Sequence, residues 1–168
     1  MGKVYIIGNG YIGDFLSNGF KDKYHFVGIC RSTKRNCDIN ISLDISKNKE
    51  ALHNLIEPNG IIVYLAAPQK KGLVDTTLSN FLTSIKKYNV EKIIYISTSG
   101  VYGDKKDRVV NEQAKLEPIT DRAIRRVDAE NQIKCSSIKY TILRVPGIYG
   151  VNRLPIQRVK ERMPLIKN

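Results

Sequence analysis

Apolar residues along the chain follow two alternating patterns: short continuous runs, and longer stretches with helical spacing. The first run, Val4–Ile7, ends in glycine and is typical of a parallel strand buried on both faces. The next stretch, Tyr11–Phe20, places apolar residues three and four positions apart, which indicates an amphipathic helix. Ile61–Leu65 is the clearest central strand, and it follows the stop signal Pro58-Asn59-Gly60.

The same alternation continues to the end of the chain. Further strands are expected at His25–Cys30, Asp38–Leu43, Lys92–Ile96 and Lys139–Arg144. Further helices are expected at 51–56, Leu73–Tyr88, Ile119–Ile133 and Arg153–Met163. Strands that alternate with helices are joined by right-handed crossovers and therefore run parallel. The pattern predicts an α/β protein with a doubly wound parallel sheet of about six strands, a Rossmann fold, over residues 1–150.

A glycine-rich turn joins the first strand to the first helix, and it reads Gly8-Asn9-Gly10-Tyr11-Ile12-Gly13. Gly8 permits the tight turn, Gly10 leaves room for a pyrophosphate to approach the backbone, and Gly13 lets the helix pack closely on the strand. The helix N-terminus then offers free N–H groups and a partial positive charge to the anion. This turn predicts a site for the pyrophosphate of NAD or NADP, with a plain glycine turn as the alternative.

The end of the second strand indicates which of the two dinucleotides is bound. An NAD site usually has an acidic residue about 20 positions after the loop, bonded to the ribose 2′-hydroxyl. The sequence here is Ile29-Cys30-Arg31-Ser32-Thr33, without an acidic residue. Arg31 instead suits a 2′-phosphate, with Ser32 or Arg35 assisting. We therefore expect NADP in preference to NAD, and a solvated loop arginine is the alternative.

Charge and composition restrict the partners only slightly. The chain has 168 residues, 42% of them hydrophobic, which suits one globular domain. Its 28 Lys and Arg against 16 Asp and Glu give a net charge of +12, which attracts anions from nucleotides to nucleic acid. The basic residues are scattered over the chain and form no ribbon interleaved with aromatic residues. Nucleic acid is therefore not the expected partner.

Several features indicate a cytoplasmic protein. No apolar stretch approaches the roughly 18 residues that a membrane helix needs, and the chain opens without a secretory signal pattern. The three cysteines, Cys30, Cys37 and Cys135, form no CxxC pair. We therefore expect reduced, buried or half-buried thiols, no disulfide framework and no metal site.

Four motifs occur in a characteristic order. They are Gly8-x-Gly10-x-x-Gly13, Leu65-Ala66-Ala67-Pro68, Ser97-Thr98-Ser99-Gly100-Val101-Tyr102-Gly103 and Leu143-Arg144-x-Pro146-Gly147-Ile148-Tyr149-Gly150. Together they resemble the extended short-chain dehydrogenase/reductase family, also called the NAD-dependent epimerase/dehydratase family. The resemblance runs from Lys3 to about Asn168. It implies a Rossmann fold, a dinucleotide cofactor and often a nucleotide-sugar substrate.

The resemblance also implies roles for single residues. Asp44 and Ile45 stand where the family contacts the adenine. Positions expected to follow the cofactor from its ribose to its nicotinamide are Leu65, Ala66, Ala67 and Pro146. Thr98 stands at the family's catalytic Ser/Thr position, whose hydroxyl bonds the reacting oxygen of the substrate, and Ser99 is the alternate. Turn hydroxyls that satisfy backbone groups are the other interpretation of these two side chains.

The helix expected over Ile119–Ile133 departs from the family pattern. Family members resembling this chain carry Tyr-x-x-x-Lys there, with the tyrosine as general acid/base. The two positions hold Arg122 and Arg126, and no tyrosine lies between Tyr102 and Tyr140. Arginine keeps its proton at physiological pH, so Arg122 is no substitute for the base, whereas Arg126 can still bond a ribose or phosphate. The pattern resembles an atypical branch that keeps the fold without the Tyr-Lys pair, and a solvated helix face is the alternative interpretation of both arginines.

Family members also continue well beyond residue 168. Residues 151–168 resemble the start of a truncated substrate-binding region, so we expect the substrate domain to be largely absent. An expression fragment, a shortened gene product and half of a split protein are the alternatives, and the open pocket makes a homodimer or second subunit plausible. Two functions remain: an oxidoreductase or epimerase acting on a nucleotide sugar, with an atypical site, or a non-catalytic NAD(P)-binding sensor or subunit.

Overall fold

The computed structural model describes residues 1–31, 37–47, 55–106, 108–151 and 153–161. Six strands form one parallel sheet in the order β3-β2-β1-β4-β5-β6. Their bounds are β1 (Gly2–Ile7), β2 (Tyr24–Cys30), β3 (Ile39–Ser42), β4 (Ile61–Tyr64), β5 (Lys92–Thr98) and β6 (Tyr140–Val145). The strand order reverses between β1 and β4, so the predicted doubly wound Rossmann sheet is confirmed.

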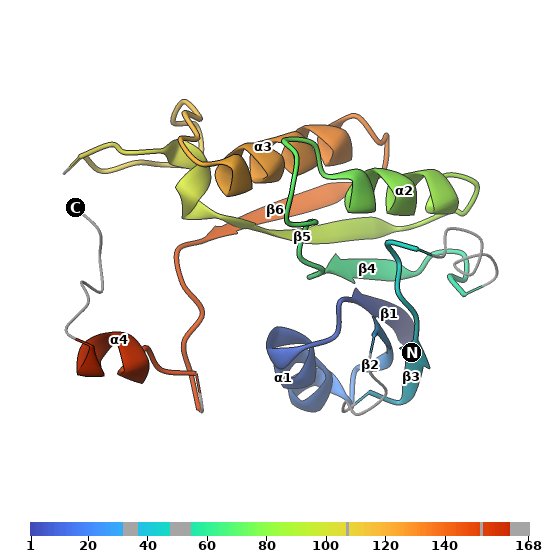
Figure 1. Ribbon diagram of the computed structural model, residues 1–168. Helices are drawn as coiled ribbons and strands as arrows, with labels where there is room; N and C mark the ends of the chain where they lie inside the picture. The colour runs from blue at the N-terminus through green and yellow to red at the C-terminus, as the bar shows by residue number, and fades with distance from the viewer. Residues whose placement is uncertain (32–36, 48–54, 107, 152, 162–168) are drawn as a thin grey trace.

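Helices cover both faces of this sheet. The helices are α1 (Tyr11–Phe20), α2 (Thr76–Ile85), α3 (Asp121–Lys134) and α4 (Ile156–Lys160), with a 3₁₀ turn, η2 (Ser99–Tyr102), directly after β5. Figure 1 shows α2 and α3 on one face, α1 on the other, and α4 apart from the sheet. None of the described helices has both the length and the apolar character that crossing a membrane requires.

The alternation of side chains along β1 explains its continuous apolar run. Tyr5 and Ile7 are buried in the larger core, which lies beneath α2 and α3. Val4 and Ile6 are buried in the smaller core, which includes Leu16 of α1. Because β1 is paired on both edges and covered on both faces, its inner positions are apolar apart from the Tyr5 hydroxyl, which accepts a hydrogen bond from the N–H of Glu57 at 2.9 Å.

The helix ends differ from those that the hydrophobic pattern predicted where a capping residue starts the helix. Helix α2 begins at Thr76 and not at the predicted Leu73, because the Asp75 carboxylate accepts a hydrogen bond from the N–H of Leu78 at 3.0 Å. It ends at Ile85 rather than Tyr88. The predicted α1 has the observed bounds.

Some expectations fall outside the described residues or are wrong. Ser32 is among the residues that the structure does not describe, as are 51–54 of the helix expected at 51–56. Cys30 and Cys37 are half-buried as expected, whereas Cys135 is exposed just beyond the C-terminus of α3. Cys135 is the C-cap residue of α3 and lies at the surface, so the expectation of a buried or half-buried thiol is wrong there.

Candidate functional site

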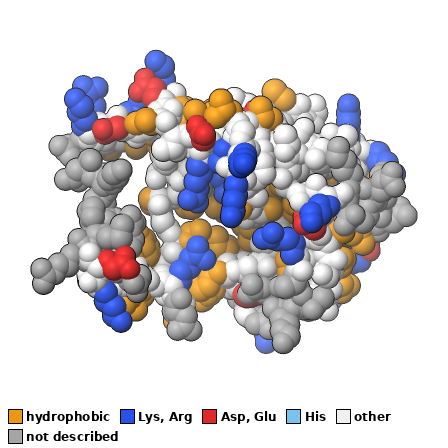
Figure 2. Space-filling view, viewed as in Figure 1, with side chains coloured by type: hydrophobic (Ala, Val, Ile, Leu, Met, Phe, Trp, Pro, Cys, Tyr) orange, Lys and Arg blue, Asp and Glu red, His pale blue; other side chains and the backbone are white. Residues whose placement is uncertain are grey.

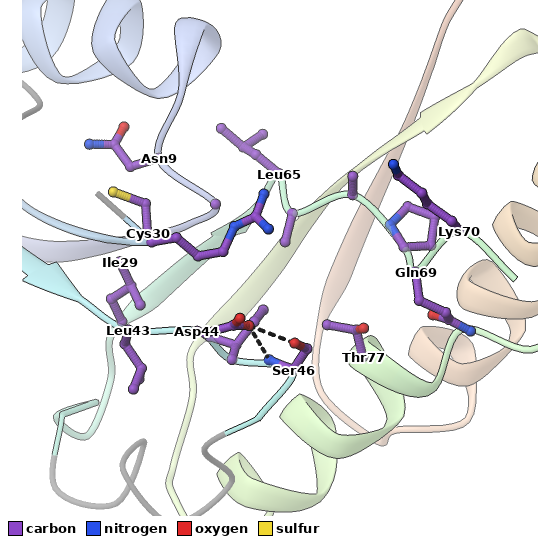
Figure 3. A pocket seen from close by; sticks show the side chains of 16 residues that line it. Asn9, Ile29, Cys30, Leu43, Asp44, Ser46, Leu65, Gln69, Lys70 and Thr77 are labelled. Atoms are coloured by element: carbon purple, nitrogen blue, oxygen red, sulfur yellow. Dashed lines mark hydrogen bonds between the residues drawn. The ribbon is translucent and has the colours of Figure 1, made fainter. Parts of the chain in front are cut away.

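A cavity of about 670 Å³ opens at the carboxyl ends of the strands, around the point where the strand order reverses. Its walls come from the ends of β1, β2 and β4, from the residues after β3 and from α2. In Figure 3, Asn9 and Cys30 lie at one end, and Gln69, Lys70 and Thr77 at the other. Its size is typical of a pocket for a small ligand or cofactor.

Half of the lining residues belong to the set that the sequence predicted. These are Gly8, Asn9, Arg31, Asp44, Ile45, Leu65, Ala66 and Ala67. The other predicted positions that the structure describes lie outside the walls of this cavity: Gly10, Tyr11, Ile12, Gly13, Thr98, Ser99, Arg126 and Pro146. The cavity therefore corresponds to the adenosine half of the predicted site.

Gly8 makes the tight turn that brings the loop over the sheet. Its φ of +84° lies in the left-handed region, which favours glycine. The N–H groups of Gly8 and Asn9 both donate to the carbonyl of Ile29, at 2.8 and 3.2 Å. A Cβ on Gly8 would lie 2.6 Å from the Cα of Ala66, so the ends of β1 and β4 meet too closely for any side chain.

The buried side chain of Asn9 anchors the glycine loop to the protein interior. It is 3% exposed, and its amide donates to the Cys37 thiol at 3.2 Å. A Cβ on Gly13 would stand 2.0 Å from the Asn9 Oδ1, and one on Gly28 would stand 2.6 Å from its Nδ2. Asn9 thus fills a notch that two glycines leave open. The sequence identified the position but gave no sign of this anchoring contact.

The remaining glycine of the loop leaves space for a ligand. A Cβ on Gly10 would have no neighbour nearer than the Gly8 carbonyl at 3.8 Å. Gly10 also precedes α1 as its N-cap and supplies no side-chain cap. The first N–H groups of this helix are therefore available to an anion, and the loop fits the pyrophosphate of a dinucleotide.

The charged groups at the adenosine end are fixed by local hydrogen bonds. Asp44 accepts from the Oγ of Ser46 at 2.6 Å and from its N–H at 3.0 Å, as Figure 3 shows. These hydrogen bonds, with the nearby charges of Lys47 and Arg31, lower the pKa of Asp44. Arg31 is exposed, and no carboxylate of the described residues lies within ion-pair distance of its guanidinium.

The wall opposite Arg31 was mostly missed by the sequence analysis. It is formed by the residues after β4, which include Gln69 and Lys70. Helix α3 holds this segment in place, because buried Arg125 donates to the carbonyl of Gly72. The sequence signal for this wall was Lys70, two positions after Pro68. Whether that lysine lines the cavity depends on the path of the backbone after β4, which the sequence alone does not give.

Thr98 stands at the carboxyl end of β5, beside Val145 of β6. Its hydroxyl accepts a hydrogen bond from the N–H of Gly100 at 3.3 Å and so caps η2. This contact corresponds to the turn role that the sequence left open for Thr98. Ser97 points to the other face of the sheet and donates to the buried Glu130 at 2.6 Å.

The two arginines at the Tyr-Lys positions have different surroundings. Arg122 is exposed on the first turn of α3. The Nη1 of Arg126 donates to the Tyr95 hydroxyl at 2.7 Å and to the Ile96 carbonyl at 3.3 Å. Tyr95 is fully buried, and burial raises its pKa to about 12 even though Arg126 opposes the rise. The phenol that Arg126 contacts is thus neither accessible nor a base near neutral pH.

A second buried network, also missed from the sequence, ties α3 to β6. Arg144 donates to both oxygens of Glu130, from Nε at 3.0 Å and from Nη2 at 2.6 Å. Its Nη1 donates to the hydroxyl of Tyr102 at 2.9 Å and to the carbonyl of Glu112 at 3.0 Å. This arginine therefore holds both η2 and the polar loop that follows it against the sheet.

A parallel sheet of this order, with a glycine loop at its switch point, defines the dinucleotide-binding class of Rossmann proteins. The chain belongs to the NAD(P)H-binding family, whose profile matches residues 8–165. No curated protein matches the sequence.

Solved structures share this fold at low sequence identity. UDP-glucuronic acid 4-epimerase from Bacillus cereus in complex with NAD has a TM-score of 0.75 at 24% identity, over 97% of this chain and 65% of that one. The Bordetella bronchiseptica enzyme WbmH in complex with NAD⁺ has a TM-score of 0.73 at 22% identity, over 97% and 64%. The UDP-Glc/GlcNAc 4-epimerase from Campylobacter jejuni has a TM-score of 0.72 at 21% identity, over 86% and 53%.

The chain spans about 65% of the length of the Bacillus cereus epimerase that it matches. The TM-scores establish a shared fold and confirm the predicted Rossmann architecture. The family profile supports the nicotinamide dinucleotide that the motif resemblance implied.

Proposed function

We propose that this protein binds NADP in preference to NAD, with the adenosine half in the cavity at the ends of β1, β2 and β4. One observation carries the proposal: Arg31 lines the cavity and has no ion-pair partner among the described residues. A guanidinium held at the ribose end of an adenosine site matches the geometry of a 2′-phosphate. Lys70 on the opposite wall adds a second positive charge.

The other lining residues take the roles that their chemistry permits. The pyrophosphate binds at Gly10 and the N-terminus of α1, where the backbone N–H groups lack a side-chain cap. The carboxylate of Asp44, kept ionised and oriented by Ser46, accepts from the exocyclic amine of the adenine. The small side chains of Ala66 and Ala67 leave room for the ribose.

Binding of NADPH and NADH to Arg31→Ala tests the dinucleotide preference. We expect the variant to lose about tenfold or more in NADPH affinity, because charge-assisted hydrogen bonds to phosphate are lost. Its NADH affinity stays within about threefold of the parent, since NADH has no 2′-phosphate. Lys21→Ala removes the same charge from an exposed position beyond the C-terminus of α1 and serves as the matched control. Tighter binding of NADH than NADPH by the parent protein contradicts the preference.

At the nicotinamide end, we propose that the bound cofactor is held without turnover, as in a sensor or subunit. The surroundings of Arg126 support this: it contacts the inaccessible phenol of Tyr95, and its position is the one where the family resemblance implies the lysine. Because arginine keeps its proton near neutral pH, neither Arg122 nor Arg126 can act as the general base at these two positions.

Turnover of a nucleotide sugar is the second candidate, and the position of Thr98 at the end of β5 favours it. The matched structures from Bacillus cereus and Campylobacter jejuni are described as epimerases of UDP-sugars. Absorbance at the nicotinamide band, with a panel of nucleotide sugars, separates the two candidates. Cofactor turnover that Thr98→Ala abolishes supports the enzyme, whereas cofactor binding without turnover supports the sensor.

A further inference from the structure

The segment after β6 returns to the glycine loop and places an arginine there. Figure 1 shows this segment running down from the end of β6 toward the side of α1. The backbone of Gly150 lies so close to the ring of Tyr11 that a Cβ on Gly150 would stand 2.0 Å from the Tyr11 Oη. The guanidinium carbon of Arg153 lies 5.2 Å from the centroid of the same ring. Because Tyr11 is the first residue of α1, Arg153 is held beside the N-terminus of that helix.

The contact is supported on both sides. The ring of Tyr11 packs on Phe15, with centroids 4.9 Å apart, so the ring is held between an aromatic neighbour and a guanidinium. The N–H of Arg153 donates to the Gly150 carbonyl at 2.9 Å, and the two residues form an antiparallel bridge. The close approach of Gly150 to Tyr11 and the contact of Arg153 with the Tyr11 ring together place Arg153 beside the glycine loop.

The guanidinium of Arg153 lies over the Tyr11 ring, and a contact of this kind leaves its N–H groups available to another partner. A guanidinium that stacks on an aromatic ring uses its face and keeps its in-plane N–H groups for an anion. Among the residues that the structure describes, no carboxylate lies within ion-pair distance of Arg153. Figure 2 shows several Lys and Arg side chains gathered around a hollow on this face of the molecule.

We infer that Arg153 binds a diphosphate group and is positioned for this by Tyr11. A diphosphate suits the place, because the uncapped N–H groups of α1 and the open space at Gly10 lie next to the Tyr11 ring. The inference rests on the proposed function, since the first candidate is the diphosphate of the bound dinucleotide. The diphosphate of a second nucleotide bound beside the cofactor presents the same chemistry.

Calorimetric titrations of Arg153→Ala, Arg153→Lys and the parent protein test the inference. ADP-ribose is the probe for the cofactor diphosphate, and UDP added to NADP-saturated protein is the probe for a second nucleotide. We expect Arg153→Ala to lose about tenfold in affinity for one of the two probes, and Arg153→Lys to recover only part of it, because lysine lacks the planar fork. Lys160→Ala removes an equal charge from exposed α4 and should change neither affinity by more than about twofold.

A second pair of variants tests the contact with Tyr11 while leaving Arg153 intact. Gly150→Ala places a methyl group against the Tyr11 hydroxyl, and φ at Gly150 is not positive, so the effect is steric. We expect this variant to weaken the same probe severalfold by moving Arg153 away from the loop. In a Tyr11→Phe background the hydroxyl is gone, and the loss caused by Gly150→Ala should shrink.

The outcomes separate this inference from the proposed function. If the parent protein binds neither ADP-ribose nor NADP, both fail. Dinucleotide binding by the parent, with both probe affinities unchanged in Arg153→Ala, overturns the role of Arg153 and leaves the proposed function standing. An equal loss in Arg153→Ala and Lys160→Ala assigns the effect to net charge and also overturns the inference.

Discussion

The guanidinium of Arg126 lies 5.5 Å from the centre of the Tyr95 ring and donates to its hydroxyl at 2.7 Å. The pair joins α3 to the middle of β5 inside the core. A cation and a phenol one hydrogen bond apart are the elements of a proton-transfer pair. Here the phenol is fully buried, so the arrangement stabilises the fold and offers nothing to a substrate.

Tyr95→Phe should therefore make the free energy of unfolding fall less steeply with pH in the alkaline range. The pKa of Tyr95 is raised to about 12 from an ordinary value of 10.0, so the fold favours the neutral phenol. The resulting stability is fully present below pH 10.0 and is lost as the pH rises toward about 12. Urea unfolding at a series of pH values measures this. A Tyr95→Phe profile parallel to that of the parent between those limits would contradict the assignment.

Two alanine substitutions within α1 should act in opposite directions. A methyl group on Gly13 meets the Asn9 Oδ1 at 2.0 Å and the Ile6 Cγ2 at 3.0 Å, so Gly13→Ala should destabilise the protein by about 1–3 kcal/mol. Gly19, in the same helix, has nothing within 4 Å of its Cβ position. Gly19→Ala should stabilise it by about 0.5–1 kcal/mol through helix propensity. Thermal unfolding followed by circular dichroism compares the two, and destabilisation by both would show that the notch beside Asn9 is not special.

Removing Arg144 should be among the most damaging single changes. Glu130 is fully buried, and Arg144→Met leaves its charge without its bidentate partner, at a cost of about 3–5 kcal/mol. Replacing both partners, as in Glu130→Gln with Arg144→Met, removes the stranded charge. The double variant should unfold at a higher denaturant concentration than Arg144→Met alone, and the reverse order would rule out the buried charge as the cause.

Variants of Asp75 should show how much a buried capping carboxylate lowers the free energy of unfolding. Burial raises its pKa from 3.8, and one of its oxygens is buried without a partner among the described residues. The protonated form is favoured by the fold, so this contribution is present below pH 3.8 and lost as the pH rises through the elevated pKa. Asp75→Asn keeps the cap without the charge, so its free energy of unfolding should rise relative to that of the parent as the pH rises above 3.8. Asp75→Ala, which loses the cap, should lose about 1 kcal/mol of stability.

The sequence was sufficient to predict the sheet and the glycine loop, because both depend on local patterns. Val4–Ile7 is uniformly apolar since β1 is covered on both faces, and the spacing of Gly8 and Gly13 follows from contacts with Ala66 and Asn9. Each of these contacts restricts the type of residue that can stand at one position, and that restriction is visible in the sequence. Helix ends were less accurate, because the cap at Asp75 competes with an apolar pattern that continues past it.

The far wall of the cavity and the Arg153 contact could not be predicted in the same way. Lys70 lines the cavity because α3 holds the backbone that follows it, and the hydrogen bond from Arg125 to Gly72 joins positions far apart in sequence. Arg153 meets Tyr11 only once the segment after β6 has returned to α1. Single lysines and arginines in a chain of net charge +12 carry no local signal of such contacts.

The close approach of Gly8 to Ala66 has a consequence for the order of folding. The glycine loop has its final shape only when β4 has docked beside β1, because the Ala66 backbone supplies one side of the turn. Strand β1 and helix α1 are made first on the ribosome, yet they acquire a ligand-binding surface only after the chain has passed β4. The first half of the sheet therefore lacks a complete ligand-binding surface until the second half has docked on it, and a ligand that binds only the joined sheet stabilises that junction by mass action.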